Sequence, residues 1–155
     1  SLEAYLPDDY VADSRQKIEL YKRMREADND AQLDEIKDDL IDRFGDYPQP
    51  VVNLLAITHL KRFADAAWVE RITQNAQTLV LTLSPQATAK AEGVAVFQAL
   101  KATTLKARVA ADKAKMRISL MIPKQMPAAE WLHELEAFLE ALVHVVAPDA
   151  KPVEV

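Results

Sequence analysis

Four acidic side chains recur at helical spacing in one short segment. They are Glu35, Asp38, Asp39 and Asp42, at positions i, i+3, i+4 and i+7, which share one face of an α-helix. We call this set the acidic ridge. Acids near the C-terminal end of a helix are disfavoured by about 0.3–1 kcal/mol each, and only Arg43 lies close enough in sequence to compensate. Most such series are solvated helix faces. A helix that keeps acids at its unfavourable end is, however, more consistent with a contact between these acids and a basic partner.

Three basic residues gather on one face of a predicted β-hairpin in the second half of the chain. Lys106, Arg108 and Arg117 fall on the polar side of an alternating pattern between residues 105 and 122. No aromatic side chains interleave with them, so we do not expect stacking on nucleotides. The alternatives are a solvated face, or a contact with a protein or with phosphate.

The residue types that usually carry catalysis are scarce. The sequence has no cysteine, and its two glycines, Gly45 and Gly93, are too few for a phosphate-binding loop. His133 and His144 share one face of a predicted helix, but they lie about 16 Å apart, too far for one zinc ion. We interpret these two and His59 as ordinary histidines. The sequence therefore predicts no catalytic residue, metal site or cofactor, and indicates that the chain is not an enzyme by itself.

The composition is that of one globular domain. The chain has 155 residues, half of them hydrophobic, and no apolar run approaches the roughly 18 residues of a membrane span. A net charge of -5 argues against a general nucleic-acid binder. The charge is uneven, because residues 1–50 hold 14 acidic and 7 basic side chains, whereas residues 101–124 hold seven basic and one acidic. The first residue is Ser1 rather than methionine, so we expect a fragment of a larger protein.

Three helices are predicted in the N-terminal part, and they must position the acidic ridge. The first spans about residues 13–27, with Asp13 as its N-cap and Ile18, Tyr21 and Met24 at helical spacing. The second spans about residues 31–44 and carries an apolar stripe opposite the ridge, made of Leu33, Ile36, Leu40 and Phe44. Gly45 stands where a left-handed residue closes a helix, and a third helix follows Pro50 over about residues 51–66.

In the second half of the chain, apolar and polar residues alternate at every second position in several segments, as is typical of β-strands. Strands are predicted at residues 68–73 and 78–83, and a helix near residues 93–102. In the second hairpin, pairing Ala111 with Met116 places eight apolar residues on one buried face: Leu105, Ala107, Val109, Ala111, Met116, Ile118, Leu120 and Ile122. A last helix covers about residues 127–146.

The predicted fold class is therefore α+β, with short N-terminal helices followed by a small antiparallel sheet of two hairpins packed with helices. We expect an extended segment or linker at residues 1–12, a single compact domain at residues 13–146 and a flexible tail at residues 147–155.

Several sequence words recur in the order and with the spacing of a known family. They are LPDDYVAD (residues 6–13), LYKR (20–23) and DEIKDDLIDRFG (34–45), followed by Pro48. Over about residues 5–60 the chain resembles the C-terminal domain of bacterial transcription-repair coupling factors. Beyond Trp68 the agreement is one of pattern, in the order of hairpins and helices.

The resemblance implies a regulatory role in a larger protein. Members of this family are ATP-dependent DNA translocases that remove RNA polymerase stalled at DNA damage and recruit UvrA for nucleotide excision repair. ATP, magnesium and DNA would bind motor domains upstream of this chain. The C-terminal domain would mask the N-terminal UvrA-binding module of the same polypeptide until RNA polymerase is engaged. A bacterial, cytoplasmic location without a membrane is also implied.

The family's contacting acids match Asp39 and Asp42 in this sequence, and Glu35, Asp38 and Arg43 lie beside them on the same predicted helix. The alternative function is a nucleic-acid or RNA polymerase contact module that uses Lys106, Arg108 and Arg117.

Overall fold

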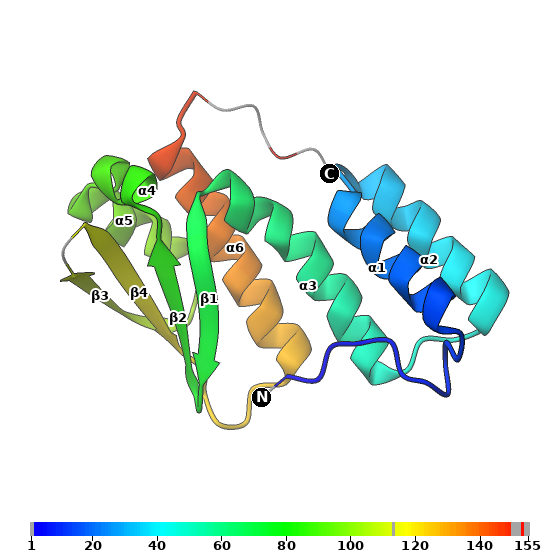
Figure 1. Ribbon diagram of the computed structural model, residues 1–155. Helices are drawn as coiled ribbons and strands as arrows, with labels where there is room; N and C mark the ends of the chain where they lie inside the picture. The colour runs from blue at the N-terminus through cyan, green and yellow to red at the C-terminus, as the bar shows by residue number, and fades with distance from the viewer. Residues whose placement is uncertain (1, 113, 150–152, 154–155) are drawn as a thin grey trace. The chain divides into compact units, whose positions relative to one another are not determined.

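The computed structural model describes residues 2–112, 114–149 and 153 (Figure 1). The chain divides into two compact units, an N-terminal unit at Leu2–Arg62 and a C-terminal unit that begins at Phe63. Helix α3 (Gln49–Ala66) runs across the boundary between them. The sequence predicts one compact domain at residues 13–146, whereas the contacts group this stretch into two units.

The N-terminal unit consists of α1 (Ser14–Glu26), α2 (Asp30–Phe44) and most of α3. Local capping sets the helix ends. The Asp13 carboxylate accepts a hydrogen bond from the Arg15 amide, and the Asn29 side chain accepts one from the Gln32 amide. Gly45 closes α2 with φ 87°, and its amide donates to the Ile41 carbonyl at 3.0 Å. The Asp13 cap and the closing role of Gly45 are features that the sequence predicts, whereas the Asn29 cap comes from the structure.

The segment before α1 belongs to the core of this unit, so residues 2–12 are an extended entry segment and not a linker. Leu6 and Val11 are buried together with the apolar stripe of α2. The Leu6 amide donates to the Tyr21 hydroxyl at 2.8 Å, and the Asn53 side chain donates to the Glu3 carbonyl at 2.9 Å. These bonds satisfy the extended backbone, as buried polar groups require.

The first helix follows the predicted spacing except at Ile18, because Met24 is buried and Tyr21 packs against the core. Leu20 and Met24 are buried, whereas Ile18 is 69% exposed. On α2 the prediction is confirmed, because Leu33, Ile36 and Leu40 are buried.

The C-terminal unit is a four-stranded antiparallel sheet with helices. Its elements are β1 (Val69–Asn75), β2 (Thr78–Leu83), α4 (Pro85–Lys90), α5 (Gly93–Ala99), the 3-10 turn η1 (Leu100–Ala102), β3 (Lys106–Asp112), β4 (Lys115–Met121) and α6 (Ala128–Val146). The strand order is β1-β2-β4-β3, so the two hairpins join through β2 and β4. Helix α4 packs on β2, β4 and α6, and α6 runs beside the sheet (Figure 1). The predicted α+β class is confirmed.

Alternation divides the sheet into an inner and an outer face. Leu79, Leu81 and Leu83 of β2 are buried on the inner face, as are Ile118 and Leu120 of β4. The predicted register is confirmed, because Ala111 pairs with Met116. The prediction that all eight hairpin residues are buried is wrong for β3: Ala111 is exposed, and Ala107 and Val109 are half-buried. The cause is the strand order, since β3 lies at the edge of the sheet.

Two further predictions meet the structure differently. The sequence predicts no helix between the strand that ends at residue 83 and the helix near residue 93, but Pro85 begins helix α4, and the Ser84 hydroxyl caps it through the Ala87 amide. The predicted flexible tail at residues 147–155 falls largely outside the described residues. In the part of the chain that is described, no helix is long and apolar enough to cross a membrane.

Candidate functional site

The acidic ridge lies on the face of α2 opposite its buried stripe. Glu35, Asp38 and Asp42 are exposed. Because the three share one side of the helix, their carboxylates form a local concentration of negative charge. In the described residues none of the three carboxylates has an ion-pair partner. This part of the ridge has the character that helical spacing predicts.

The fourth member of the ridge, Asp39, is neutralised within its own unit. Arg23 of α1 donates to Asp39 Oδ2 at 2.7 Å, and Arg43 of α2 donates to the same oxygen at 3.1 Å. The hydrogen bond from Arg23 is the main reason that the pKa of Asp39 lies below its ordinary value. Both ends of the Arg23 pair are about one-third exposed. Asp39 therefore joins α1 to α2, and it is not the freely available acid that the ridge pattern alone suggests.

Arg43 compensates for Asp39 and also contacts an aromatic ring. Its guanidinium carbon lies 5.1 Å from the centre of the Phe44 ring, within the range of a cation–π contact. These two contacts hold Arg43 at the edge of the ridge, where it screens Asp39 more than Asp42.

An apolar residue adjoins the exposed acids and was not identified from the sequence. Ile41 is 40% exposed and stands three residues after Asp38 and one before Asp42 on α2. On a helix this spacing places Ile41 beside Asp38. An exposed isoleucine beside carboxylates can be buried when a partner binds. It would then add apolar buried area to a contact that otherwise consists of hydrated ion pairs. Its only signal in the sequence is an apolar residue that lies off the stripe of Leu33, Ile36, Leu40 and Phe44.

The C-terminal end of α2 is held by tyrosines from other segments. The Tyr10 hydroxyl donates to the carbonyls of Gly45 at 2.8 Å and of Leu40 at 3.3 Å. The Tyr47 hydroxyl donates to the Lys37 carbonyl at 2.7 Å. Partial burial raises the pKa of both phenols. The Gly45 carbonyl lies beyond the last turn of α2, so the Tyr10 hydroxyl satisfies an acceptor that the helix itself leaves open.

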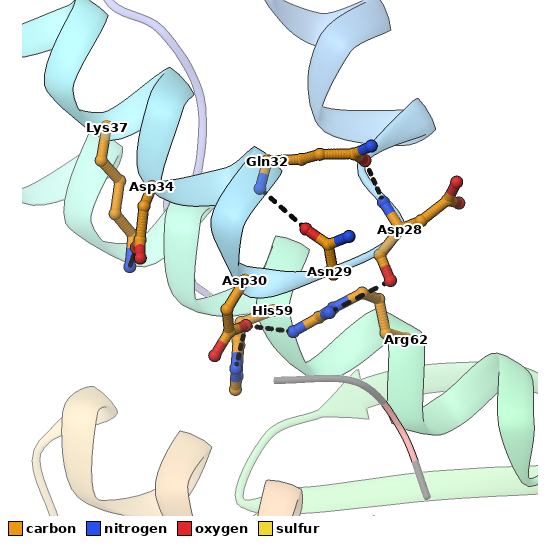
Figure 2. A network of polar contacts seen from close by, with 8 residues as sticks. All are labelled: Asp28, Asn29, Asp30, Gln32, Asp34, Lys37, His59 and Arg62. Carbon is orange, nitrogen blue, oxygen red and sulfur yellow. Dashed lines mark hydrogen bonds and ion pairs between the residues drawn. The ribbon is translucent and has the colours of Figure 1, made fainter. Parts of the chain in front are cut away.

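The N-terminal end of α2 is tied to α3 by a polar network (Figure 2). Asp30 forms an ion pair with Arg62, and its Oδ1 lies 3.0 Å from His59 Nε2. Arg62 also donates to the Asp28 carbonyl at 3.3 Å. His59 is thus a structural partner of Asp30. The other two histidines are exposed, and the described residues contain no group of side chains that could hold a metal ion.

The second predicted site lies in the C-terminal unit. Lys106, Arg108 and Arg117 are exposed, and the register places them on the outer face of the sheet. No described pairing connects them with α2, so the two predicted sites belong to different units.

The comparisons with known proteins show the family of the chain. A family model described as the TRCF domain matches residues 1–94. The chain belongs to the transcription-repair coupling factor family. It is 33% identical over 144 residues to the transcription-repair-coupling factor of Bacillus subtilis, and 34% identical over 146 residues to that of Staphylococcus epidermidis. These matches cover 93% and 94% of the chain, but the chain spans only 12% of the length of each relative.

A solved structure extends the agreement to the second half. The crystal structure of the C-terminal domain of a transcription-repair coupling factor superposes with a TM-score of 0.86 at 33% identity. The match covers 97% of this chain and 92% of that one. The resemblance seen in residues 5–60 is thus confirmed, and the sheet and α6 share the family fold as well. This chain corresponds to the C-terminal domain of the family and not to a motor domain.

Proposed function

We propose that this domain is an autoinhibitory module that masks the UvrA-binding module of the same polypeptide until RNA polymerase is engaged. The contact surface is the exposed part of the acidic ridge, made of Glu35, Asp38 and Asp42 with Ile41 beside them. The observation that carries the proposal is that these three carboxylates are exposed and unpaired among the described residues, while Asp39 is neutralised.

Helix electrostatics support this assignment. Asp38 and Asp42 lie in the last two turns of α2, where the negative end of the helix dipole disfavours acids. Asp39 has the same unfavourable interaction with the helix dipole, but its hydrogen bonds with Arg23 and Arg43 offset it. Asp42 has no such compensation in the described part of its own domain. A basic surface on another domain would supply it.

The energies suit a reversible switch. Exposed ion pairs contribute about 0.2–1 kcal/mol each, so two or three of them make a poor complex between separate molecules. In one polypeptide the two surfaces meet at an effective concentration of about millimolar, which keeps a weak contact mostly closed. Engagement of RNA polymerase can then shift the population toward the open state, because it has little binding energy to overcome.

The first prediction concerns the three exposed acids. Glu35→Gln, Asp38→Asn and Asp42→Asn together should weaken binding of this chain to the isolated UvrA-binding module, because three attractions to a basic surface are lost. We expect roughly a tenfold loss of affinity at low salt, from about 0.5 kcal/mol per pair. Isothermal titration calorimetry at low and high salt would measure it, and the loss should shrink as salt screens the contact.

A matched control separates position from net charge. Asp9→Asn, Glu19→Gln and Glu26→Gln remove the same charge from exposed positions outside the ridge. This variant should bind as the parent chain does. Equal losses of affinity in both triple variants would show that binding depends on the net charge of the chain and not on the position of the acids. Unchanged affinity in the ridge variant would show that the ridge is not the contact surface. Asp39 is left intact because its loss would also release Arg23 and Arg43.

The same proposal assigns no catalysis and no cofactor to this domain. ATP, magnesium and DNA belong in this view to motor domains upstream, and the location is the bacterial cytoplasm. The purified chain should therefore not hydrolyse ATP, with or without DNA.

A further inference from the structure

The outer face of the sheet gathers cations from both hairpins. One row of paired residues crosses the four strands, in the order Arg71, Thr82, Arg117 and Ala110. Directly paired residues point to the same side of a sheet, so Arg71 of β1 shares the face of Arg117. The pairing of β2 with β4 places these two arginines on one face. The alternation within either hairpin alone does not predict that they share it.

The remaining cations extend this face along β3. Arg108 is opposite Ser119, and Lys106 is opposite Met121. Strand spacing puts Arg71 and Arg117 about 10 Å apart, and residues two apart on β3 are separated by about 7 Å. Arg71, Lys106, Arg108 and Arg117 are all exposed. We call these four residues and the hydroxyl side chains between them the basic sheet face.

Few acids offset this charge. Glu70 is paired with Lys115, whose Nζ lies 2.7 Å from its Oε2. Within the described residues, Arg71, Lys106 and Arg108 have no ion-pair partner. From residue 63 to 151 the sequence has ten basic and nine acidic residues, so the negative net charge of the chain lies mainly in residues 2–62. The low net charge of the whole chain therefore does not describe this face.

The chemistry between the cations indicates the kind of partner. Thr73, Thr82 and Ser119 place hydroxyl groups among the basic side chains, and hydroxyls and guanidinium groups are common donors to phosphate oxygens. A stable protein interface normally has an apolar core with aromatic anchors. Among the described residues of this face, the large apolar side chains are Val80 and Met121, both half-buried, and Ala110 adds only a methyl group. A phosphate backbone therefore fits this face better than a protein surface does.

We propose that the basic sheet face binds the phosphate backbone of double-stranded nucleic acid, without sequence preference, through Arg71, Lys106, Arg108 and Arg117. The absence of aromatic side chains from this face favours a duplex over a single strand, because single-strand binding relies on stacked bases. The surface lies in the C-terminal unit, so this proposal is independent of the role assigned to α2.

The test is the fluorescence anisotropy of a short labelled DNA duplex titrated with the whole chain. We expect a dissociation constant of about 10⁻⁴–10⁻⁶ M that weakens with salt, with a slope of log K against log salt near about -3 for three or four phosphates. Arg71→Gln alone should make the slope shallower by about 1. Arg71→Gln, Lys106→Gln and Arg108→Gln together should abolish binding.

Three arms decide between explanations. Lys22→Gln, Lys61→Gln and Lys124→Gln lower the net charge equally at exposed positions off the face and should leave binding intact. If Arg71→Gln has no effect while Lys106→Gln and Arg108→Gln abolish binding, the binding surface does not extend across the four strands to β1. Binding to polyglutamate but not to DNA would overturn the proposal in favour of an acidic protein. Equal thermal unfolding midpoints of all variants would show that the losses are not losses of fold.

Discussion

At the scale of single residues, Asp39 and Asp42 belong to the same acidic ridge but have different surroundings. They are three residues apart on α2. Asp39 faces Arg23 and Arg43, whereas Asp42 is exposed and faces no cation among the described residues. Their substitutions should therefore affect different properties: Asp39 the stability of the N-terminal unit, and Asp42 the contact with a partner.

Asp39→Asn should lower the free energy of unfolding by about 0.5–1 kcal/mol at neutral pH, since its two pairs are partly exposed. Because the hydrogen bond from Arg23 lowers the pKa of Asp39, the stabilisation is present above the unfolded pKa of about 4. It is lost as pH falls through the lower folded pKa. Urea unfolding at about pH 7 and about pH 3 should show that the difference between parent and variant is smaller in acid.

Asp42→Asn is the control for this prediction. It removes an acid from the end of α2 without breaking a described pair, so the free energy of unfolding should change by no more than about 0.5 kcal/mol. A destabilisation equal to that of Asp39→Asn would contradict the division of roles.

At the scale of elements, the end of α2 depends on a residue far away in sequence. Tyr10→Phe removes the hydroxyl that donates to the carbonyls of Leu40 and Gly45 but keeps the ring beside Phe44, at 5.7 Å between ring centres. The free energy of unfolding should fall by about 1 kcal/mol, measured by urea denaturation. Tyr5→Phe, at a site that is 44% exposed, is the matched control and should be neutral. Equal effects would show that Tyr10 acts through its ring alone.

At the scale of the whole molecule, the two units should respond separately to damage in their cores. Leu40 in the N-terminal unit and Leu120 in the C-terminal unit are both fully buried, and Leu→Ala at such a site costs about 2–5 kcal/mol. Leu40→Ala should raise hydrogen–deuterium exchange in peptides of α1 and α2 and leave β2 and β4 protected. Leu120→Ala should give the reverse. Global loss of protection from either change would mean that the chain unfolds as one cooperative body.

Much of the fold could be predicted from the sequence, because its determinants are local. Asp13 caps the helix that begins beside it, Gly45 closes α2 with a positive φ, and strict alternation sets the register of Ala111 with Met116. Each depends on residues a few positions away, so periodicity and capping reveal it. Local reasoning missed helix α4, because Pro85 suits both the residues after a strand and the first turn of a helix.

Tertiary structure decided what covers each face. Periodicity places Asp39 on a helix face, but only the packing of α1 brings Arg23 to it from 16 residues away. Alternation puts Arg71 on one side of a strand, but only the pairing of β2 with β4 adds it to the basic hairpin. Leu6 and Val11 are buried by helices far along the chain. The sequence by itself determined which side chains share a face, and the long-range packing determined which of those faces remain available to a partner.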